Sequence, residues 1–178
     1  VAGAVGPAGP KGDTGAAGTQ GVAGPAGGFT HYLGELFNGG IIYYLYIGSD
    51  GLEHGLIVAL TESSTSRQSP VSRTFADRTD DGAYNTNLMT NSLAADYVAS
   101  LGSGWYLPSN DELILLYTNR FTVQKALRAG GYTPLYNHSY WTSTEKDTNN
   151  GYNLNFDTGT VASVGKPNGR AVRGVRSF

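Results

Sequence analysis

The chain opens with VAGAVGPAGPKGDTGAAGTQGVAGPAG (residues 1–27), in which glycine occupies every third position from Gly3 to Gly27, nine times without a gap. Three polyproline II strands wound about one axis leave no room for a side chain where they cross, so each third residue must lack a Cβ atom. A flexible Gly/Ala-rich linker is the alternative, but such linkers carry no strict period. The repeat therefore predicts a collagen triple helix, and a chain that is one third of a homotrimer.

The other residues of the repeat describe the kind of collagen. Pro7, Pro10 and Pro25 all occupy the X position and none occupies Y, which is typical of bacterial or viral collagens. With three prolines the strands are poorly preorganised, so a triple helix of this length is marginal on its own. We expect a stalk about 80 Å long, and a further part of the molecule that holds the three chains together. Because the repeat starts without Met, we also expect more repeats before Val1.

The period stops after Gly28, so we divide the chain into a stalk (1–27), a connector (28–36) and a globular head (37–178) of one-domain size. The absence of cysteine excludes disulfides, Cys-based zinc sites and thiol catalysis. One of the 12 basic and one of the 14 acidic residues lie in the stalk, leaving 11 and 13 in the rest of the chain, which argues against nucleic acid as a partner. The longest apolar run, residues 41–47, is too short to enter a membrane as a spanning helix.

The head alternates between strand and helix signals, which predicts an α+β fold. Residues 41–47 and 55–60 flank Asp50-Gly51 and predict a β-hairpin of central strands. The polar stretch 62–85 predicts a long surface loop. Apolar spacing predicts a helix at 93–101, a capping box of Ser109 with Glu112 marks the start of a second, and a short third helix is expected at 123–129. Strands at 152–156, 160–164 and 170–178 are expected to form a closing β-meander.

Large side chains in these elements have predicted structural roles. Trp105 and Trp141 are expected in the core. Arg173 lies between apolar residues on a probable central strand, so we expect a buried ion pair with Glu112 or Glu145. Tyr140 and Trp141 are neighbours in a strand and point to opposite faces, so at most one of them is expected to be available for stacking on a sugar.

Four motifs in order carry a resemblance to a known family. They are Gly39-Gly40-Ile41-Ile42 with Glu53-His54-Gly55-Leu56-Ile57, Trp105-Tyr106-Leu107-Pro108-Ser109 with Glu112-Leu113, Tyr140-Trp141-Thr142-Ser143-Thr144-Glu145, and Arg170-Ala171-Val172-Arg173. Together they resemble the C-terminal domain family of the Legionella collagen-like adhesin, which has relatives in Bacteroidetes and phages. The resemblance covers nearly all of residues 37–178. It implies a variant of the C-type-lectin-like fold, with two helices flanking a small twisted antiparallel sheet and long loops on one side.

The resemblance also implies a function. It implies a trimeric extracellular adhesin or receptor-binding protein, on a bacterial cell surface or a phage virion, whose heads bind surface glycans such as sulfated glycosaminoglycans. This head differs from that expectation in being slightly acidic. The alternative is a trimerisation head of a cell-surface filament or phage tail fibre, which nucleates and clamps the collagen helix.

Residues for catalysis or metal binding are not predicted. His31, His54 and His138 stand in no recognisable arrangement with a nucleophile. The carboxylates of Asp80-Asp81 and of Asp111-Glu112 are sequence neighbours whose side chains should diverge, which is poor geometry for a paired acid and base. The loop with Asp147, Asn149 and Asn150 matches no calcium motif, so a plain surface loop is favoured. We therefore expect no enzyme activity, no cofactor and no metal site.

Ligand contact is expected from loop residues without a packing role. The first set lies in the long loop and consists of Arg67, Arg73, Arg78 and Tyr84. The second set lies on loops between late strands and consists of Tyr132, Tyr136, His138, Lys146 and Lys166. Guanidinium groups suit sulfate or carboxylate, and aromatic rings suit sugar faces. The alternative for both sets is ordinary solvated surface.

Overall fold

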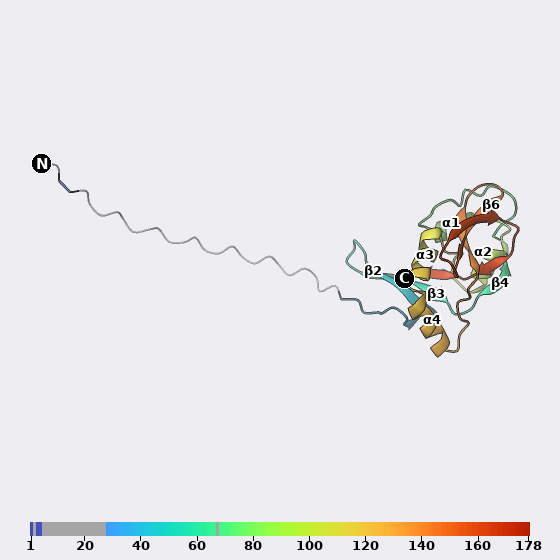
Figure 1. Ribbon diagram of the computed structural model, residues 1–178, viewed down its shortest axis with the longest axis horizontal. Helices are drawn as coiled ribbons and strands as arrows, with labels where there is room; N and C mark the ends of the chain where they lie inside the picture. The colour runs from blue at the N-terminus through green and yellow to red at the C-terminus, as the bar shows by residue number, and fades with distance from the viewer. Residues whose placement is uncertain (2, 5–27, 67) are drawn as a thin grey trace.

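A computed structural model describes residues 1, 3–4, 28–66 and 68–178 of the chain. The predicted stalk falls almost entirely outside the described residues, so its triple helix stays a prediction. The described part is an α+β domain with four helices and nine strands in two small sheets (Figure 1). None of its helices has the length and apolar character needed to cross a bilayer.

The first sheet has the order β1-β2-β3-β9, formed by Leu36–Phe37, Gly40–Ile47, Glu53–Ala59 and Val175–Ser177. The predicted hairpin is confirmed: β2 and β3 are antiparallel and central, and Ile47 faces Glu53 across the turn. Gly51 sits in that turn at φ +77°, a conformation that glycine adopts without strain. Most of β3 and the first half of β2, up to Tyr43, are buried, because neighbours cover them on each side, whereas Tyr46 and Ile47 at the end of β2 are exposed.

The second sheet has the order β4-β8-β5-β6-β7, formed by Ser63–Ser66, Arg170–Val172, Ser139–Glu145, Asn150–Asn155 and Val161–Gly165. The prediction of one closing meander is wrong, since β8 belongs to this sheet and β9 to the first. The chain changes sheet at Gly174, where an added Cβ would lie 2.7 Å from a methyl of Leu101. The prediction of a single antiparallel sheet is also wrong in detail, because β8 runs parallel to β5.

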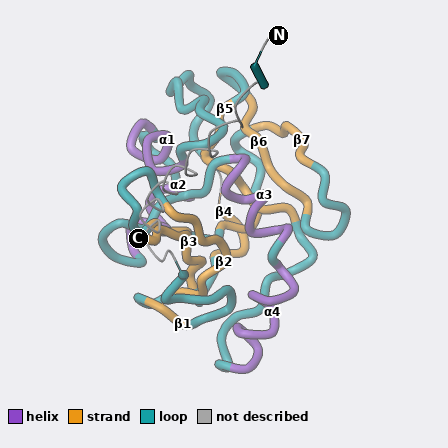
Figure 2. The backbone as a smooth tube through the Cα atoms, turned by 90° about the vertical axis from the view of Figure 1, so that its left-hand side faces the viewer, coloured by secondary structure: helices purple, strands orange, loops and turns teal. Residues whose placement is uncertain are grey.

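Four helices pack on these sheets: α1 (Gly82–Leu88), α2 (Leu93–Ser100), α3 (Asn110–Thr118) and α4 (Arg120–Ala129). The capping box of Ser109 and Glu112 is confirmed at the start of α3. α3 contacts β2 of the first sheet and β5 and β6 of the second, so it joins the two (Figure 2). The predicted long loop is shorter than expected, because β4 lies inside residues 62–85 and α1 begins there.

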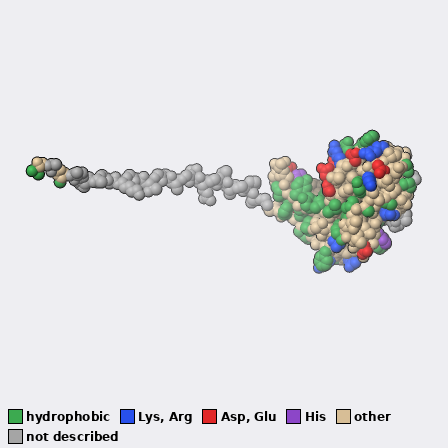
Figure 3. Space-filling model, turned by 45° about the horizontal axis from the view of Figure 1, so that its top comes forward, with side chains coloured by type: hydrophobic (Ala, Val, Ile, Leu, Met, Phe, Trp, Pro, Cys, Tyr) green, Lys and Arg blue, Asp and Glu red, His purple; other side chains and the backbone are tan. Residues whose placement is uncertain are grey.

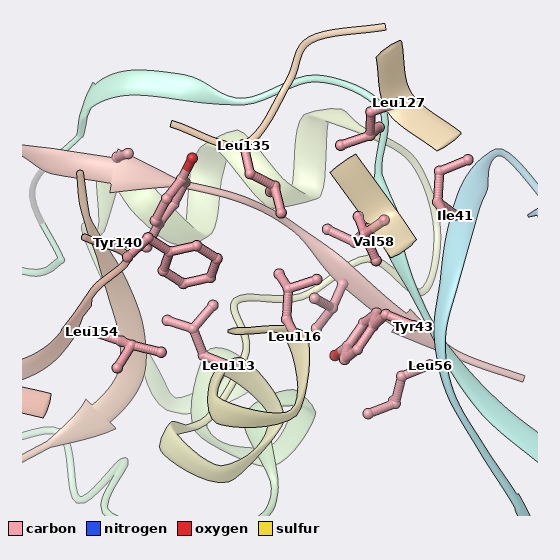
Figure 4. Packing of buried hydrophobic residues seen from close by; sticks show 14 of the residues in the cluster. Ile41, Tyr43, Leu56, Val58, Leu113, Leu116, Leu127, Leu135, Tyr140 and Leu154 are labelled. Carbon is pink, nitrogen blue, oxygen red and sulfur yellow. The ribbon is translucent and has the colours of Figure 1, made fainter. Parts of the chain in front are cut away.

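The core has two parts. The larger one packs α3 and α4 between the sheets, with Leu113 and Leu116 of α3 meeting Tyr140 and Tyr43 from the two sheets (Figure 4). The smaller one surrounds Trp141, which is fully buried as predicted. Trp105 is only half-buried. Tyr140 and Trp141 are both buried, since helices and loops cover both faces of β5, and neither is available to a sugar.

Arg173 is fully buried and forms an ion pair, as predicted, but the predicted partners are wrong. Its Nη1 contacts Glu62 Oε2 at 2.9 Å, and its Nε and Nη2 donate to backbone carbonyls of Ala59 and Thr133. Ser63 of β4 pairs with Val172 of β8, and that register places Glu62 beside Arg173. Glu112 and Glu145, the predicted partners, serve other contacts.

The connector is tied to the head. The backbone N–H groups of Thr30 and His31 donate to Glu53 at the start of β3 (2.7 and 3.1 Å), and the backbone N–H of Gly34 donates to the carbonyl of Ile42. The His31 ring packs on Phe37 with ring centroids 4.2 Å apart, and Phe37 packs on the C-terminal Phe178. The connector is therefore a fixed junction between the repeat and the head.

This junction should loosen in acid. Desolvation of Glu53 by burial would raise its pKa, but the hydrogen bonds from Thr30 and His31 prevail and lower it below the usual 4.5. A carboxylate with a lowered folded pKa stabilises the fold above its unfolded pKa, and that stabilisation is lost as pH falls through the folded value. We expect amide hydrogen exchange of Thr30 and His31, corrected for intrinsic rates, to accelerate below about pH 4.5. The substitution Glu53→Gln should remove this dependence. An acceleration that persists in Glu53→Gln would show that another group controls the junction.

Candidate functional site

Two residues of the second predicted set, Tyr136 and His138, form an exposed ring stack on the loop between α4 and β5. Their centroids are 5.5 Å apart with an interplanar angle of 28°. The loop is held on both sides of Tyr136: Gln124 exchanges two hydrogen bonds of 2.7 Å with the backbone of Leu135, and the backbone N–H of Tyr136 donates to Tyr140 Oη at 2.8 Å. The stack is thus a fixed aromatic platform.

A hollow of about 310 Å³ lies on one side of this stack, between the loop and α4. Its lining combines apolar, amide and cationic groups: Arg120, Phe121, Gln124, Leu135, Tyr136, Asn137 and Phe156. Phe121 is 75% exposed, although its ring is large and apolar. The Arg120 guanidinium lies 3.8 Å from the centroid of the Tyr117 ring and donates to the Tyr117 carbonyl, which fixes the cation at the edge of the hollow.

A second hollow, of about 340 Å³, lies beside His138. It is lined by His138, Ser139, Gly169, Arg170 and Ala171. The Arg170 Nη1 donates to the backbone carbonyl of Gly169 at 2.7 Å. Within the described ranges, neither Arg120 nor Arg170 forms an ion pair with a carboxylate. We call Arg120, Phe121, Tyr136, His138 and Arg170 the Tyr136 site.

The arginines of the first predicted set are paired with carboxylates. Arg73 contacts Asp77 at 3.0 Å and the buried Glu145 at 3.2 Å. Arg78 contacts Asp81 at 2.9 Å and lies 3.5 Å above the Tyr84 ring. Asp81 also caps α1 by accepting a hydrogen bond from the backbone N–H of Tyr84. These side chains stabilise the 68–81 loop and the start of α1, and their charges are already compensated. Arg67 lies outside the described residues.

Lys166 lies in the turn between β7 and β8, as predicted, but its side chain is buried and not available to a ligand. Its side chain is fully buried, contacts Glu145 and donates to the carbonyl of Ser72 at 2.6 Å. Glu145 also accepts hydrogen bonds from the backbone N–H groups of Thr74 and Phe75. This cluster attaches the 68–81 loop to β5, so the role of Lys166 is structural.

The two remaining members of the second set are separated from the stack. Lys146 is exposed, and its Nζ donates to Ser163 Oγ at 3.1 Å. Its carbonyl accepts from Arg73, so the fold brings together these two residues from different predicted sets. Tyr132 is half-buried and packs against the larger core.

A hollow of about 410 Å³ brings the two carboxylate pairs together, contrary to the expectation from sequence. It is lined by Asp80, Asp81, Asp111 and Glu112 together with tyrosines of β2. Glu112 is committed to the fold, since Oε1 accepts from Tyr106 Oη (2.8 Å) and Oε2 from the backbone N–H groups of Ser109 (2.8 Å) and Gly82 (3.2 Å). Burial raises the pKa of Glu112 even against these hydrogen bonds. Asp81 is likewise occupied by Arg78 and the cap of α1.

The oxygen-rich loop after β5 closes its own turn. Asp147 Oδ1 accepts from the backbone N–H groups of Asn149 and Asn150, and the Asn150 amide donates to the same carboxylate. These hydrogen bonds, that from the Asn150 side chain first, lower the pKa of Asp147. In the part of the chain that the structure covers, no group of three or more His, Cys, Asp or Glu side chains is placed to hold a metal ion.

Sequence reasoning missed three members of the Tyr136 site, although the pattern held a signal for two. Val123 and Leu127 define the buried stripe of α4, and Phe121 falls off that stripe, which marks it as an exposed aromatic. Arg170 and Arg173 are three residues apart, so on an extended chain they face opposite sides, and only one can be buried. Nothing in the sequence singles out Arg120.

Comparison with known proteins gives a fold relationship only. No family model and no curated protein matches the chain. Among solved structures, a fimbrial protein from Bacteroides ovatus ATCC 8483 is similar, with a TM-score of 0.55 and 17% sequence identity over 72% of this chain. The match spans 37% of that protein. At this identity the likeness shows a shared α+β fold and no more.

Proposed function

We propose that this chain is a trimeric surface adhesin whose head binds acidic, sulfated saccharides at the Tyr136 site. The observation that carries the proposal is the exposed Tyr136–His138 stack, of which Tyr136 lines one hollow with Arg120 and His138 lines another with Arg170, while neither arginine has a carboxylate partner among the described residues. The similarity of fold to a protein described as fimbrial agrees with a role at the cell surface. The resemblance to the collagen-like adhesin family supports the same proposal and the lectin-like classification.

The site has the chemistry that such ligands require. An aromatic face stacks on the apolar face of a sugar ring, and a guanidinium fork donates two parallel hydrogen bonds to a sulfate or carboxylate. Because Arg120 and Arg170 form no ion pair among the described residues, a slightly acidic head still presents local positive charge at this site. Three heads on one stalk gain avidity, so each site need bind only weakly.

Substitutions within the site should weaken binding without affecting folding. We expect Tyr136→Ala and Arg170→Ala each to reduce binding to an immobilised heparin tetrasaccharide by about tenfold, which corresponds to about 1.4 kcal/mol per head. Biolayer interferometry at 50 and 300 mM salt measures the effect. Arg78→Ala is the matched control, because that guanidinium is already paired with Asp81. Equal losses in Arg78→Ala and Arg170→Ala would place the ligand elsewhere.

The second candidate function is a trimerisation head that only clamps the collagen. One observation favours it: large apolar side chains lie exposed around the connector. We infer no catalytic activity in either case, since Glu112 and Asp81, which line the acidic hollow, are engaged in structural hydrogen bonds. The two functions separate experimentally, because a pure clamp keeps its trimer but binds no saccharide.

A further inference from the structure

Exposed apolar side chains concentrate at the end of the head that follows residue 28. Seven of them come from the connector, β1 and the β2–β3 hairpin: Phe29, Tyr32, Leu33, Leu36, Tyr46, Ile47 and Leu52, with exposed fractions from 38% to 66%. Figure 3 shows hydrophobic side chains gathered on that side of the head. We call these seven residues the base face.

The base face is rigidly presented. Glu53, which directly follows the hairpin turn, accepts hydrogen bonds from Thr30 and His31 of the connector, so the two segments that carry the apolar side chains are fastened to each other. The His31, Phe37 and Phe178 rings form a cluster beneath them. Side chains fixed in place before association lose less conformational entropy when a partner packs on them.

The segments that form the base face carry little free charge. Lysine and arginine are absent from residues 12–66 of the sequence. The carboxylates of these segments are engaged, Glu35 with His31, Asp50 with His54, and Glu53 with Thr30, and the carboxylates of Asp80 and Asp111 lie at the edge of the face, in the hollow that Tyr46 also lines. Depletion of charge around exposed aromatic and aliphatic side chains is the composition found at the cores of protein interfaces.

A hollow of about 470 Å³ opens on this face. It is lined almost entirely by apolar and aromatic groups from the connector and β2, including Phe29, Tyr32, Leu33 and Tyr44, with Asn119 at the start of α4. A hollow of this size beside protruding rings allows side chains of one copy to enter the surface of the next. The face is therefore suited to packing against another copy of itself.

The sequence indicates which partner packs on the base face. Nine Gly-X-Y triplets predict that three chains are wound together up to residue 27, and the base face begins two residues later. We infer that the base faces of three heads pack against one another around the end of the stalk, and that this contact nucleates and clamps the collagen helix. The inference rests on the trimer in the proposed function. It also supplies what a stalk with three prolines lacks, since joined heads hold the chains at high effective concentration.

Charge placed on the base face should break the clamp. In the full chain we expect Tyr32→Asp with Leu52→Asp to shift the trimer–monomer equilibrium, measured by sedimentation equilibrium, by at least tenfold towards monomer, and to lower the midpoint of the triple-helix circular dichroism transition. Both side chains are more than 60% exposed, so near-ultraviolet circular dichroism of the head should be unchanged. Val71→Asp, at a 55% exposed site outside the base face, is the control and should leave mass and midpoint unaltered.

Cross-linking tests the same contact independently of stability. The chain has no cysteine, so Tyr32→Cys introduces a single thiol per copy. Mild oxidation at micromolar concentration should join copies of Tyr32→Cys and leave Val71→Cys uncross-linked. The inference would be overturned if the variant with both aspartates keeps the mass and the midpoint of the wild-type trimer and Tyr32→Cys forms no cross-link. The chain would then still be a trimer, joined through another surface. A monomeric wild type would instead overturn the trimer itself, while saccharide binding by the heads would remain a separate measurement.

Discussion

Replacing Arg173 with alanine is expected to lower the free energy of unfolding of the head by about 3–5 kcal/mol. The side chain is fully buried and has three partners: the carboxylate of Glu62 and the carbonyls of Ala59 and Thr133. The substitution leaves the Glu62 carboxylate, which is almost fully buried, with only the hydroxyl of Tyr140 as a hydrogen-bond donor among the described groups. A buried charge without its counter-ion is one of the few single changes that cost this much.

Differential scanning calorimetry of the full chain measures this loss as a fall in the head transition of roughly 10 °C or more. The matched control is Arg170→Ala, three residues earlier; among the described residues, its side chain donates only to the carbonyl of its neighbour Gly169. We expect Arg170→Ala to change the transition by less than about 2 °C. Similar falls in the two variants would mean that Arg173 is not the buried partner of Glu62.

Lys166 gives the second large effect. Lys166→Met should destabilise the head by about 3 kcal/mol, at the lower end for a broken buried pair, because Arg73 and two backbone N–H groups still contact Glu145. Lys146→Met removes an equal charge from an exposed site and should change stability by less than about 0.5 kcal/mol. Urea unfolding followed by tryptophan fluorescence measures both. Equal stability of the two variants would contradict the buried position of Lys166.

Local signals in the sequence were sufficient for most individual elements. The Asp50-Gly51 turn, the Ser109 capping box and the apolar spacing of 93–101 each depend on contacts within a few residues, and all three are confirmed. The burial of Trp141 and the pairing of Arg173 also followed from residue type. These predictions hold because the responsible interactions lie close together along the chain.

Long-range pairings could not be predicted in the same way. The partner of Arg173 is 111 residues away, and only the register of β4 on β8 brings Glu62 to it. Lys166 has the sequence context of a loop residue, yet residues 72–75 fold over it and bury its charge. The Tyr136 site joins α4, the 133–138 loop and the start of β8, so its composition depends on the tertiary fold.

The central claim is that a trimeric head binds acidic saccharides at the Tyr136 site. The most direct test applies the purified full chain, with its trimer verified, to a glycan array of sulfated, carboxylated and neutral members at low and high salt. We predict binding to sulfated members that weakens as salt rises, since guanidinium–sulfate contacts are screened. Binding to neutral members alone, or no binding by an intact trimer, would contradict the claim and leave the head as a clamp for the stalk.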